Sequence, residues 1–188
     1  MGEDPFAAAL ASETQLRELY DAPMERALRK QLDRLDEVAR RLIAVAPLAL
    51  VASHDAEGRC DVTPRGGQPG FVTVLDDDHL AIPDATGNNR LDTLQNVVAT
   101  GHAGVIGRLT PVGKPPRSAI VVRADEVYAH CPKAFVRSGL WDPESWPPAA
   151  DQPSAAEVSH AHLRRTDPAL TLAEVERQQA EALKYRLA

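Results

Sequence analysis

Hydrophobic residues near the N-terminus recur at helical spacing. Between Met24 and Leu42 the apolar side chains fall three or four residues apart, with charged residues between them. This spacing predicts one amphipathic helix that Pro47 ends, because proline cannot continue a helix. Ahead of it, Ser12-Glu13-Thr14-Gln15 has the form of a capping box, so a short helix is expected to begin there and turn its leucines inward.

The pattern changes to strand-like alternation after Pro47. Four strands are expected over residues 48–53, 59–63, 71–75 and 80–83. Turns at Asp55-Ala56-Glu57-Gly58 and at Asp76-Asp77-Asp78 pair them into two hairpins, and residues 64–70 between the hairpins are expected to form a loop. Two successive hairpins favour an antiparallel meander, as in a barrel or sandwich, over a doubly wound parallel sheet.

The second half of the chain mixes helices, strands and a proline-rich stretch. The expected elements are a short helix from Leu91 that Gly101 ends, strands at 103–106 and 118–130, and helices at 133–140 and 170–187. Residues 143–154 hold four prolines and are expected to run over the surface. No internal repeat is present.

Composition restricts the kinds of partner and the compartment. The 188 residues are 44% hydrophobic, and 21 basic against 27 acidic residues give a net charge of −6 without a basic block, which does not favour nucleic-acid binding. The longest apolar run, Leu42 to Ala52, is too short to span a membrane. With an acidic N-terminus and two distant cysteines, Cys60 and Cys131, a soluble cytoplasmic protein with reduced thiols is expected.

A candidate phosphate site lies at Gly87-Asn88-Asn89-Arg90, where a strand gives way to a helix. The first amides of a helix are unpaired and carry partial positive charge, so Arg90 there opposes the usual preference for acidic residues. An anion between Arg90 and the helix would explain this placement. An ordinary asparagine-capped helix with a solvent-facing arginine is the alternative, and spacing alone leaves both open.

Two further segments carry candidate ligand-binding residues. Thr63-Pro64-Arg65-Gly66-Gly67 follows a strand, and its glycines allow a ligand to approach the backbone, although an exposed arginine in a turn is the simpler interpretation. Lys133, Arg137 and Trp141 are spaced along one helical stripe that suits a phosphorylated aromatic ligand. The alternative is a solvated basic edge with Trp141 in the core. The pair His160 and His162 lacks a third metal ligand nearby.

Together these segments carry a family resemblance. The stretches concerned are ELYDAPMERALRKQLDRLD (18–36), GRCDVTPRG (58–66), PGFVTVLDDDHLAIPD (69–84), GNNRLDTLQNV (87–97), GKPPRSAIVV (113–122) and EVYAHCPKAFVRSGLWDP (126–143). In order and spacing they resemble the pyridoxamine 5′-phosphate oxidase-like, FMN-binding split β-barrel proteins, and among these the bacterial PPOX-class probable FMN-dependent enzymes.

The resemblance implies an α+β protein built on an antiparallel, Greek-key-like split β-barrel with flanking N- and C-terminal helices. One domain would span 1–188, with a helical segment at 1–46, the barrel and cofactor cleft at 47–142, and a proline-rich excursion and closing helix at 143–188. The resemblance also implies a homodimer with FMN in clefts between the subunits.

The resemblance assigns roles to nine residues. Arg65 and Gly66 would line the flavin edge, and Asn88, Asn89 and Arg90 would hold the FMN phosphate. The cleft would be completed from the other subunit by Lys133, Arg137, Ser138 and Trp141. No side chain stands out as an acid, base or nucleophile, so no catalytic residue is assigned.

The chain departs from the family pattern at two places. Gly67 stands where the family usually has an acidic residue. The family also places a hairpin, with a barrel strand, where Ile106 here runs directly into Gly107. Either a strand is truly deleted or residues are omitted from the sequence, and the unpaired edge that a deletion would leave favours omission.

The expected activity is that of an FMN-dependent oxidoreductase acting on an unknown small molecule by hydride transfer through the flavin. Two alternatives remain: a non-catalytic homodimer that stores or senses flavin, and the same fold with a deazaflavin or haem. Pyridoxamine 5′-phosphate oxidase activity itself is not expected, because the chain closes with an amphipathic helix in place of that enzyme's C-terminal substrate-binding segment.

Overall fold

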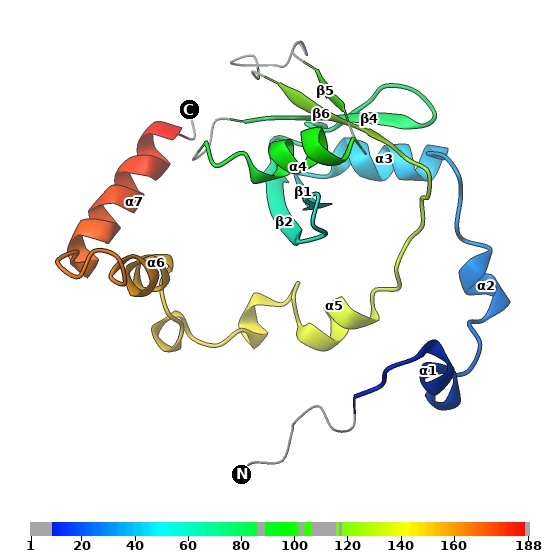
Figure 1. Ribbon diagram of the computed structural model, residues 1–188, viewed down its shortest axis with the longest axis horizontal. Coiled ribbons are helices and arrows are strands. Elements are labelled where there is room, and N and C mark those ends of the chain that lie inside the picture. The colour runs from blue at the N-terminus through cyan, green and yellow to red at the C-terminus, as the bar shows by residue number, and fades with distance from the viewer. Residues whose placement is uncertain (1–8, 86–88, 102–103, 107–115, 117, 187–188) are drawn as a thin grey trace.

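The computed structural model describes residues 9–85, 89–101, 104–106, 116 and 118–186. Within them the fold is mixed α+β (Figure 1). The helices are α1 (Glu13–Leu19), α2 (Glu25–Leu28), α3 (Glu37–Val45), α4 (Asp92–Thr100), α5 (Lys133–Ser138), α6 (Ala155–Leu163) and α7 (Leu172–Arg186). The strands are β1 (Leu48–His54), β2 (Cys60–Gly66), β3 (Thr73–Val74), β4 (His79–Pro83), β5 (Gly104–Ile106) and β6 (Ala119–Arg123).

The strands form two antiparallel sheets. One is the β1–β2 hairpin, in which Leu48 faces Gly66 and His54 faces Cys60, and the other has the order β3-β4-β6-β5. The antiparallel arrangement expected from the sequence is confirmed, and no closed barrel forms among the described residues. Strand β2 runs further than expected, because Arg65 and Gly66 pair with β1 instead of lying in a loop.

The hydrophobic core lies where α4 and the β1–β2 hairpin meet the larger sheet. Its buried cluster consists of Val72, Ile82, Val97 and Ile120. Partly buried residues of α3, β1 and α4 pack against this cluster: Ile43, Ala49, Val51 and Leu94. Alternation along β1 turns Ala49 and Val51 to the core and leaves the intervening side chains exposed. One face of the hairpin is therefore covered, and the other is not.

The single helix expected over residues 24–42 is wrong. The structure has the short α2, an extended stretch and then α3. Two contacts account for the break. Leu32 exchanges backbone hydrogen bonds with Val127, both at 2.8 Å, which requires extended backbone. Asp36 then caps a new helix by accepting a hydrogen bond from the Ala39 amide at 2.7 Å.

The first helix forms as expected but does not bury its leucines. Ser12 caps α1 by accepting from the Gln15 amide at 3.3 Å, while the Gln15 side chain accepts from the Ala11 amide instead of completing the box at Ser12. Leu16 and Leu19, expected to face inward, are exposed. Helix α1 packs against no sheet, so it has no core to face (Figure 1).

The C-terminal half contains an unexpected helix. Residues 155–163 form α6, which begins with a complete capping box between Ser154 and Glu157. Helix α7 forms as expected, with Thr171 accepting from the Glu174 amide. The long strand expected over 118–130 is shorter, since β6 ends at Arg123. The helix that Gly101 was expected to end does end there, in left-handed conformation.

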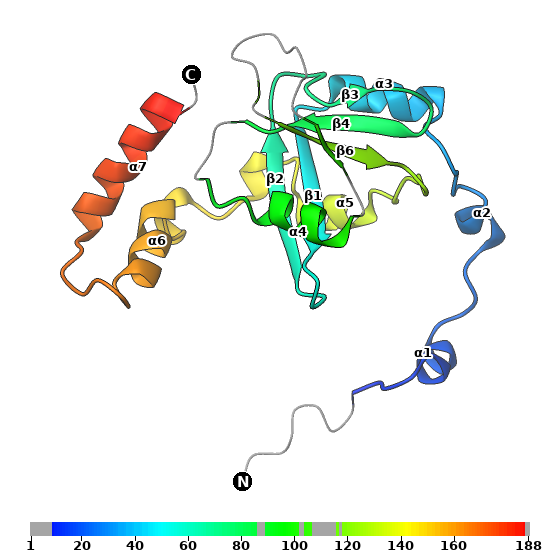
Figure 2. The same ribbon diagram turned by 45° about the horizontal axis from the view of Figure 1, so that its top comes forward.

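Helices at both ends of the chain stand away from the two sheets. Figures 1 and 2 show α1 and α2 on one side and the pair α6 and α7 on the other, with α5 below the hairpin in Figure 1. Within the described ranges, no helix is long and apolar enough to cross a membrane.

Candidate anion-binding site

A row of polar side chains on β2 faces helix α4. Alternation along β2 turns Asp61, Thr63 and Arg65 to the same side of the hairpin. The Thr63 hydroxyl is 2.9 Å from the Thr93 hydroxyl, in the first turn of α4. One turn later Asn96 donates to the Ser53 hydroxyl at 2.9 Å, and Ser53 faces Asp61 across the hairpin.

These two contacts fix the direction of α4. The middle of the helix lies at the Asp61 level of β2 and its first turn lies at the Thr63 level. Arg65 is the next residue along the same face of the strand. The N-terminal end of α4 therefore points toward the Arg65 end of β2, and Thr93 is only 1% exposed at this junction.

Arg65 is held by a partly buried ion pair. Its Nη1 donates to Asp84 Oδ1 at 2.6 Å, and the two side chains are 18% and 20% exposed. Asp84 directly follows β4, so the pair joins the two sheets. The Nε of Arg65 is buried and has no hydrogen-bond partner among the described residues. A buried donor of this kind is unfavourable unless an acceptor reaches it.

The residue directly before α4 provides no side-chain cap. Leu91 precedes the helix in left-handed conformation, with φ of 61°, and its side chain caps nothing. Asn89 is also left-handed, which is one of the two roles expected for asparagine here. Because the first amides of a helix lack intrahelical partners and carry partial positive charge, this end of α4 favours an anion. Asn88 lies outside the described residues.

Arg90 takes a position that the sequence left open. It is 77% exposed, and its Nε lies 2.5 Å from Asp92 Oδ2. Asp92 supplies the negative charge that the first turn of a helix favours, and so makes the neighbouring arginine acceptable there. For Arg90 to bind an anion, its guanidinium would first have to leave the ion pair with Asp92.

The second group of candidate residues lies together but apart from Arg65. Lys133, Arg137 and Ser138 are exposed on α5, and the Ser138 hydroxyl donates to the Phe135 carbonyl at 3.0 Å. The alternative that placed Trp141 in the core is wrong, because Trp141 is 81% exposed. Figure 1 shows α5 separated from α4 and from the larger sheet. Within one chain, the segment that carries these four residues therefore lies apart from the N-terminus of α4.

Gly66 and Gly67, at the end of β2, have local explanations. Gly66 is the exposed last residue of the strand and pairs with Leu48. A Cβ added to Gly67 would lie 2.7 Å from the Cβ of Phe71, so any side chain there requires Phe71 to move. This packing explains why glycine stands where the resembled family has an acidic residue. The expected missing hairpin falls between Ile106 and Gly107. Ile106 is described, but Gly107 lies outside the described residues.

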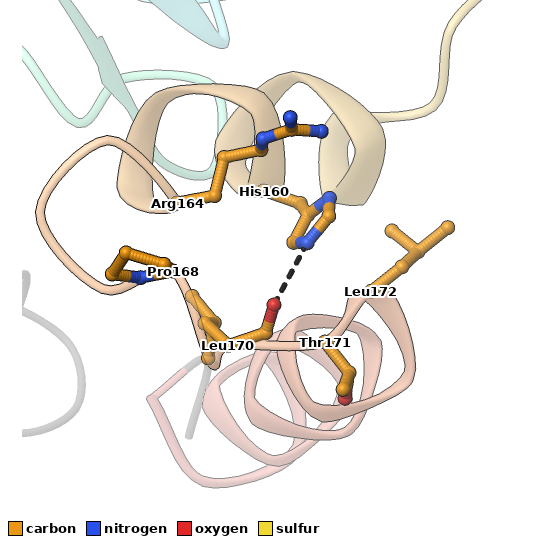
Figure 3. Close-up of a pocket in the computed structure, with 6 residues that line it drawn as sticks. All are labelled: His160, Arg164, Pro168, Leu170, Thr171 and Leu172. Carbon is orange, nitrogen blue, oxygen red and sulfur yellow. Dashed lines mark hydrogen bonds between the residues drawn. The ribbon is translucent and has the colours of Figure 1, made fainter.

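A hollow at the α6–α7 junction is a separate feature. It has a volume of about 410 Å³ and is lined by His160, Arg164, Pro168, Leu170, Thr171 and Leu172 (Figure 3). His160 Nε2 lies 3.0 Å from the Leu170 carbonyl, so this contact holds the α6–α7 turn. His162 does not line the hollow. In the described part of the chain, no group of three or more potential metal ligands comes together.

The arrangement at Arg65 suits anion binding better than acid–base chemistry. It combines a guanidinium with a helix N-terminus. Sequence reasoning identified Arg65 and the loop before α4, but it missed Asp84, Thr93 and Asn96, which hold them in place. The position of Asp84, directly after a strand and before a glycine-containing loop, was a usable signal for a residue at the sheet edge.

Comparisons with known proteins add no relative. Models of protein families, curated proteins and solved structures were all compared with the chain, and none of them matches it.

Proposed function

We propose that the chain binds the phosphate of FMN between Arg65 and the N-terminus of α4, and acts as a flavin-dependent oxidoreductase on a small organic molecule. One observation carries the proposal. Among the described residues, a buried guanidinium nitrogen has no hydrogen-bond partner. It lies at the strand end toward which the N-terminus of α4 is directed, where the Leu91 side chain provides no cap. Both features favour an anion, and a phosphate group provides several acceptor oxygens for them.

The choice of FMN comes from the resemblance of the chain's motifs, and the site is consistent with it. Arg65 Nε, the first amides of α4 and, after release from Asp92, Arg90 would hold the phosphate, with Asn88 and Asn89 forming the loop around it. The flavin, when bound, supplies hydride transfer. The residues of the chain position the cofactor through its phosphate and separate its ring from water.

The split barrel and the homodimer belong to the same proposal. The two antiparallel sheets and the helices at both chain ends are consistent with a split β-barrel flanked by helices. Since α5 lies apart from α4 and the larger sheet in Figure 1, Lys133, Arg137, Ser138 and Trp141 would complete the cleft from a second copy.

The first experiment is the visible absorption spectrum of the purified chain, repeated after FMN is added and the sample is dialysed. A retained flavin spectrum is expected. Riboflavin, which lacks the phosphate, is the matched control. Riboflavin cannot make the charge-assisted hydrogen bonds to the phosphate, which contribute about 1.5–3 kcal/mol. It should therefore bind about 10- to 150-fold more weakly than FMN. No retained flavin, or equal affinity for FMN and riboflavin, would refute the phosphate site.

A non-catalytic flavin-binding protein is the second candidate. It is favoured by one observation, namely that the described residues gathered around Arg65 include no histidine, cysteine or lysine for proton transfer. Reduction of the bound flavin by NAD(P)H, followed by reoxidation with a small-molecule substrate, supports the oxidoreductase. A flavin that stays oxidised with every donor supports storage or sensing. The spectrum itself separates FMN from a deazaflavin or haem.

A further inference from the structure

The two arginines of the candidate site are each paired with an aspartate, but the two pairs differ in burial. The pair between Arg65 and Asp84 joins the two sheets, and its side chains are 18% and 20% exposed. The pair between Arg90 and Asp92 lies at the surface, where the exposed fractions are 77% and 40%. An exposed ion pair contributes little free energy, whereas breaking a largely buried pair is costly. Asp92 is therefore the aspartate that an incoming anion can displace.

The carboxylate of Asp92 lies where the proposed phosphate would bind. Asp92 is the first residue of α4, and its Oδ2 lies 2.5 Å from Arg90 Nε. The carboxylate is thus near the positive end of the helix dipole and holds a guanidinium, and both features favour a phosphate at this place. A phosphate oxygen that approaches Arg90 Nε must first displace the carboxylate, because this nitrogen carries a single hydrogen.

We propose that Asp92 is an internal competitor for the phosphate: in the ligand-free chain its carboxylate occupies Arg90 and limits the affinity of the site. Binding then replaces one anion on the guanidinium by another. The measured affinity reflects the difference between the two contacts, not the full strength of the new one. This competition rests on the phosphate site of the proposed function and adds a residue that sets its affinity.

Asp92 also has a structural role, which differs from competition in what it changes. An acidic residue in the first turn stabilises a helix by interacting with its dipole. Removing that charge lowers the stability of α4 whether or not an anion binds. It does not change how well the chain distinguishes FMN from riboflavin, since the two ligands differ only in the phosphate. The ratio of these two affinities therefore responds to competition and not to the stability of α4.

The test is titration of the full chain with FMN and with riboflavin, followed by quenching of flavin fluorescence. Asp92→Asn should bind FMN about 2- to 5-fold more tightly than the wild type, the factor that corresponds to opening an exposed ion pair. Its affinity for riboflavin should not change. Asp125→Asn, which opens the exposed pair with Arg123, is the matched control and should leave both affinities unchanged.

A second background separates competition from repulsion at a distance. If Asp92 acts by occupying Arg90, Asp92→Asn should have no effect on FMN affinity in an Arg90→Ala chain. If the charge of Asp92 only repels the phosphate, the gain should be the same in both backgrounds. Asp92→Ser also removes the carboxylate and is well tolerated at the start of a helix, so it repeats the test if Asp92→Asn loses its far-UV circular dichroism.

Inorganic phosphate is a second probe, which does not depend on the flavin. The phosphate concentration that raises the melting temperature by a given amount should fall about 2- to 5-fold in Asp92→Asn. Unchanged FMN affinity in Asp92→Asn, or a gain that persists without Arg90, would overturn the competition and leave the flavin site standing. Phosphate binding that responds to Asp92 in a chain that retains no FMN would contradict the flavin alone. A chain that binds neither probe would contradict both.

Discussion

The ion pair between Arg65 and Asp84 allows a quantitative prediction for the Asp84→Ala variant. Removing Asp84 leaves a guanidinium that is four-fifths buried, and two of its nitrogens then lack a partner among the described residues. Breaking a fully buried pair costs about 3–5 kcal/mol, and an exposed pair contributes about 0–1 kcal/mol. Since a fifth of each side chain reaches solvent, the expected loss of unfolding free energy is about 2–3 kcal/mol.

The assay is urea and thermal unfolding of FMN-free protein followed by circular dichroism. At about 2–4 °C per kcal/mol for a chain of this size, the midpoint should fall by about 4–12 °C. Asp125→Ala, which breaks the exposed pair with Arg123, is the matched control and should cost less than about 1 kcal/mol. The double variant Arg65→Met/Asp84→Ala should lose less stability than Asp84→Ala alone, because no uncompensated charge remains.

Two results would show that this reasoning is wrong. If Asp84→Ala changes stability by less than about 0.5 kcal/mol, the pair behaves as a surface contact. If the double variant is less stable than Asp84→Ala, the charge left on Arg65 is not the source of the loss. In either case, Asp84 would not hold Arg65 in place between the sheets.

Three further predictions concern Arg90, Leu91 and Glu174. Arg90→Ala should weaken FMN binding by about 1.5–3 kcal/mol in titration calorimetry, while Arg123→Ala leaves it unchanged. Leu91→Gly should raise unfolding free energy by about 0.5–1 kcal/mol by relieving the left-handed backbone, whereas Val98→Gly in the middle of α4 should lower it, as melting curves would show. Hydrogen bonds from Arg177 and Gln178 lower the pKa of Glu174 to about 2 from 4.5. Glu174 should therefore stabilise α7 fully above pH 4.5 and lose that effect as pH falls toward 2, and Glu174→Gln should remove this part of the pH dependence of helicity.

Local signals predicted the elements that local contacts hold. Gly101 ends α4 in left-handed conformation, and Thr171 caps α7, as their positions in the sequence indicate. The capping residues of α6, Ser154 and Glu157, were equally visible in the sequence, but the surrounding prolines led to the expectation of an irregular segment. The helix begins directly after the last proline of this stretch, Pro153, so proline content alone does not indicate it.

Contacts between distant residues account for the failures. Nothing near Leu32 in the sequence indicates that its backbone pairs with Val127, and that pairing interrupts a regular helical pattern. Arg65 could be selected from its motif, but its partner Asp84 lies 19 residues away, at the end of a strand in the other sheet. The candidate site could be located from the sequence, while the contacts that orient it depend on how the two sheets meet.

The two polar contacts under α4 have a consequence for the thermodynamics of binding. Apolar contacts tolerate sliding, but a shift of α4 by one turn, about 5.4 Å, would break both Thr63–Thr93 and Ser53–Asn96. The helix is thereby locked in register on the hairpin before any ligand arrives. An anion that binds at its N-terminus meets donors that are already oriented, so little conformational entropy is lost on binding. The hydroxyl and amide pairs beneath α4 thus act as a preorganising layer for the site above them.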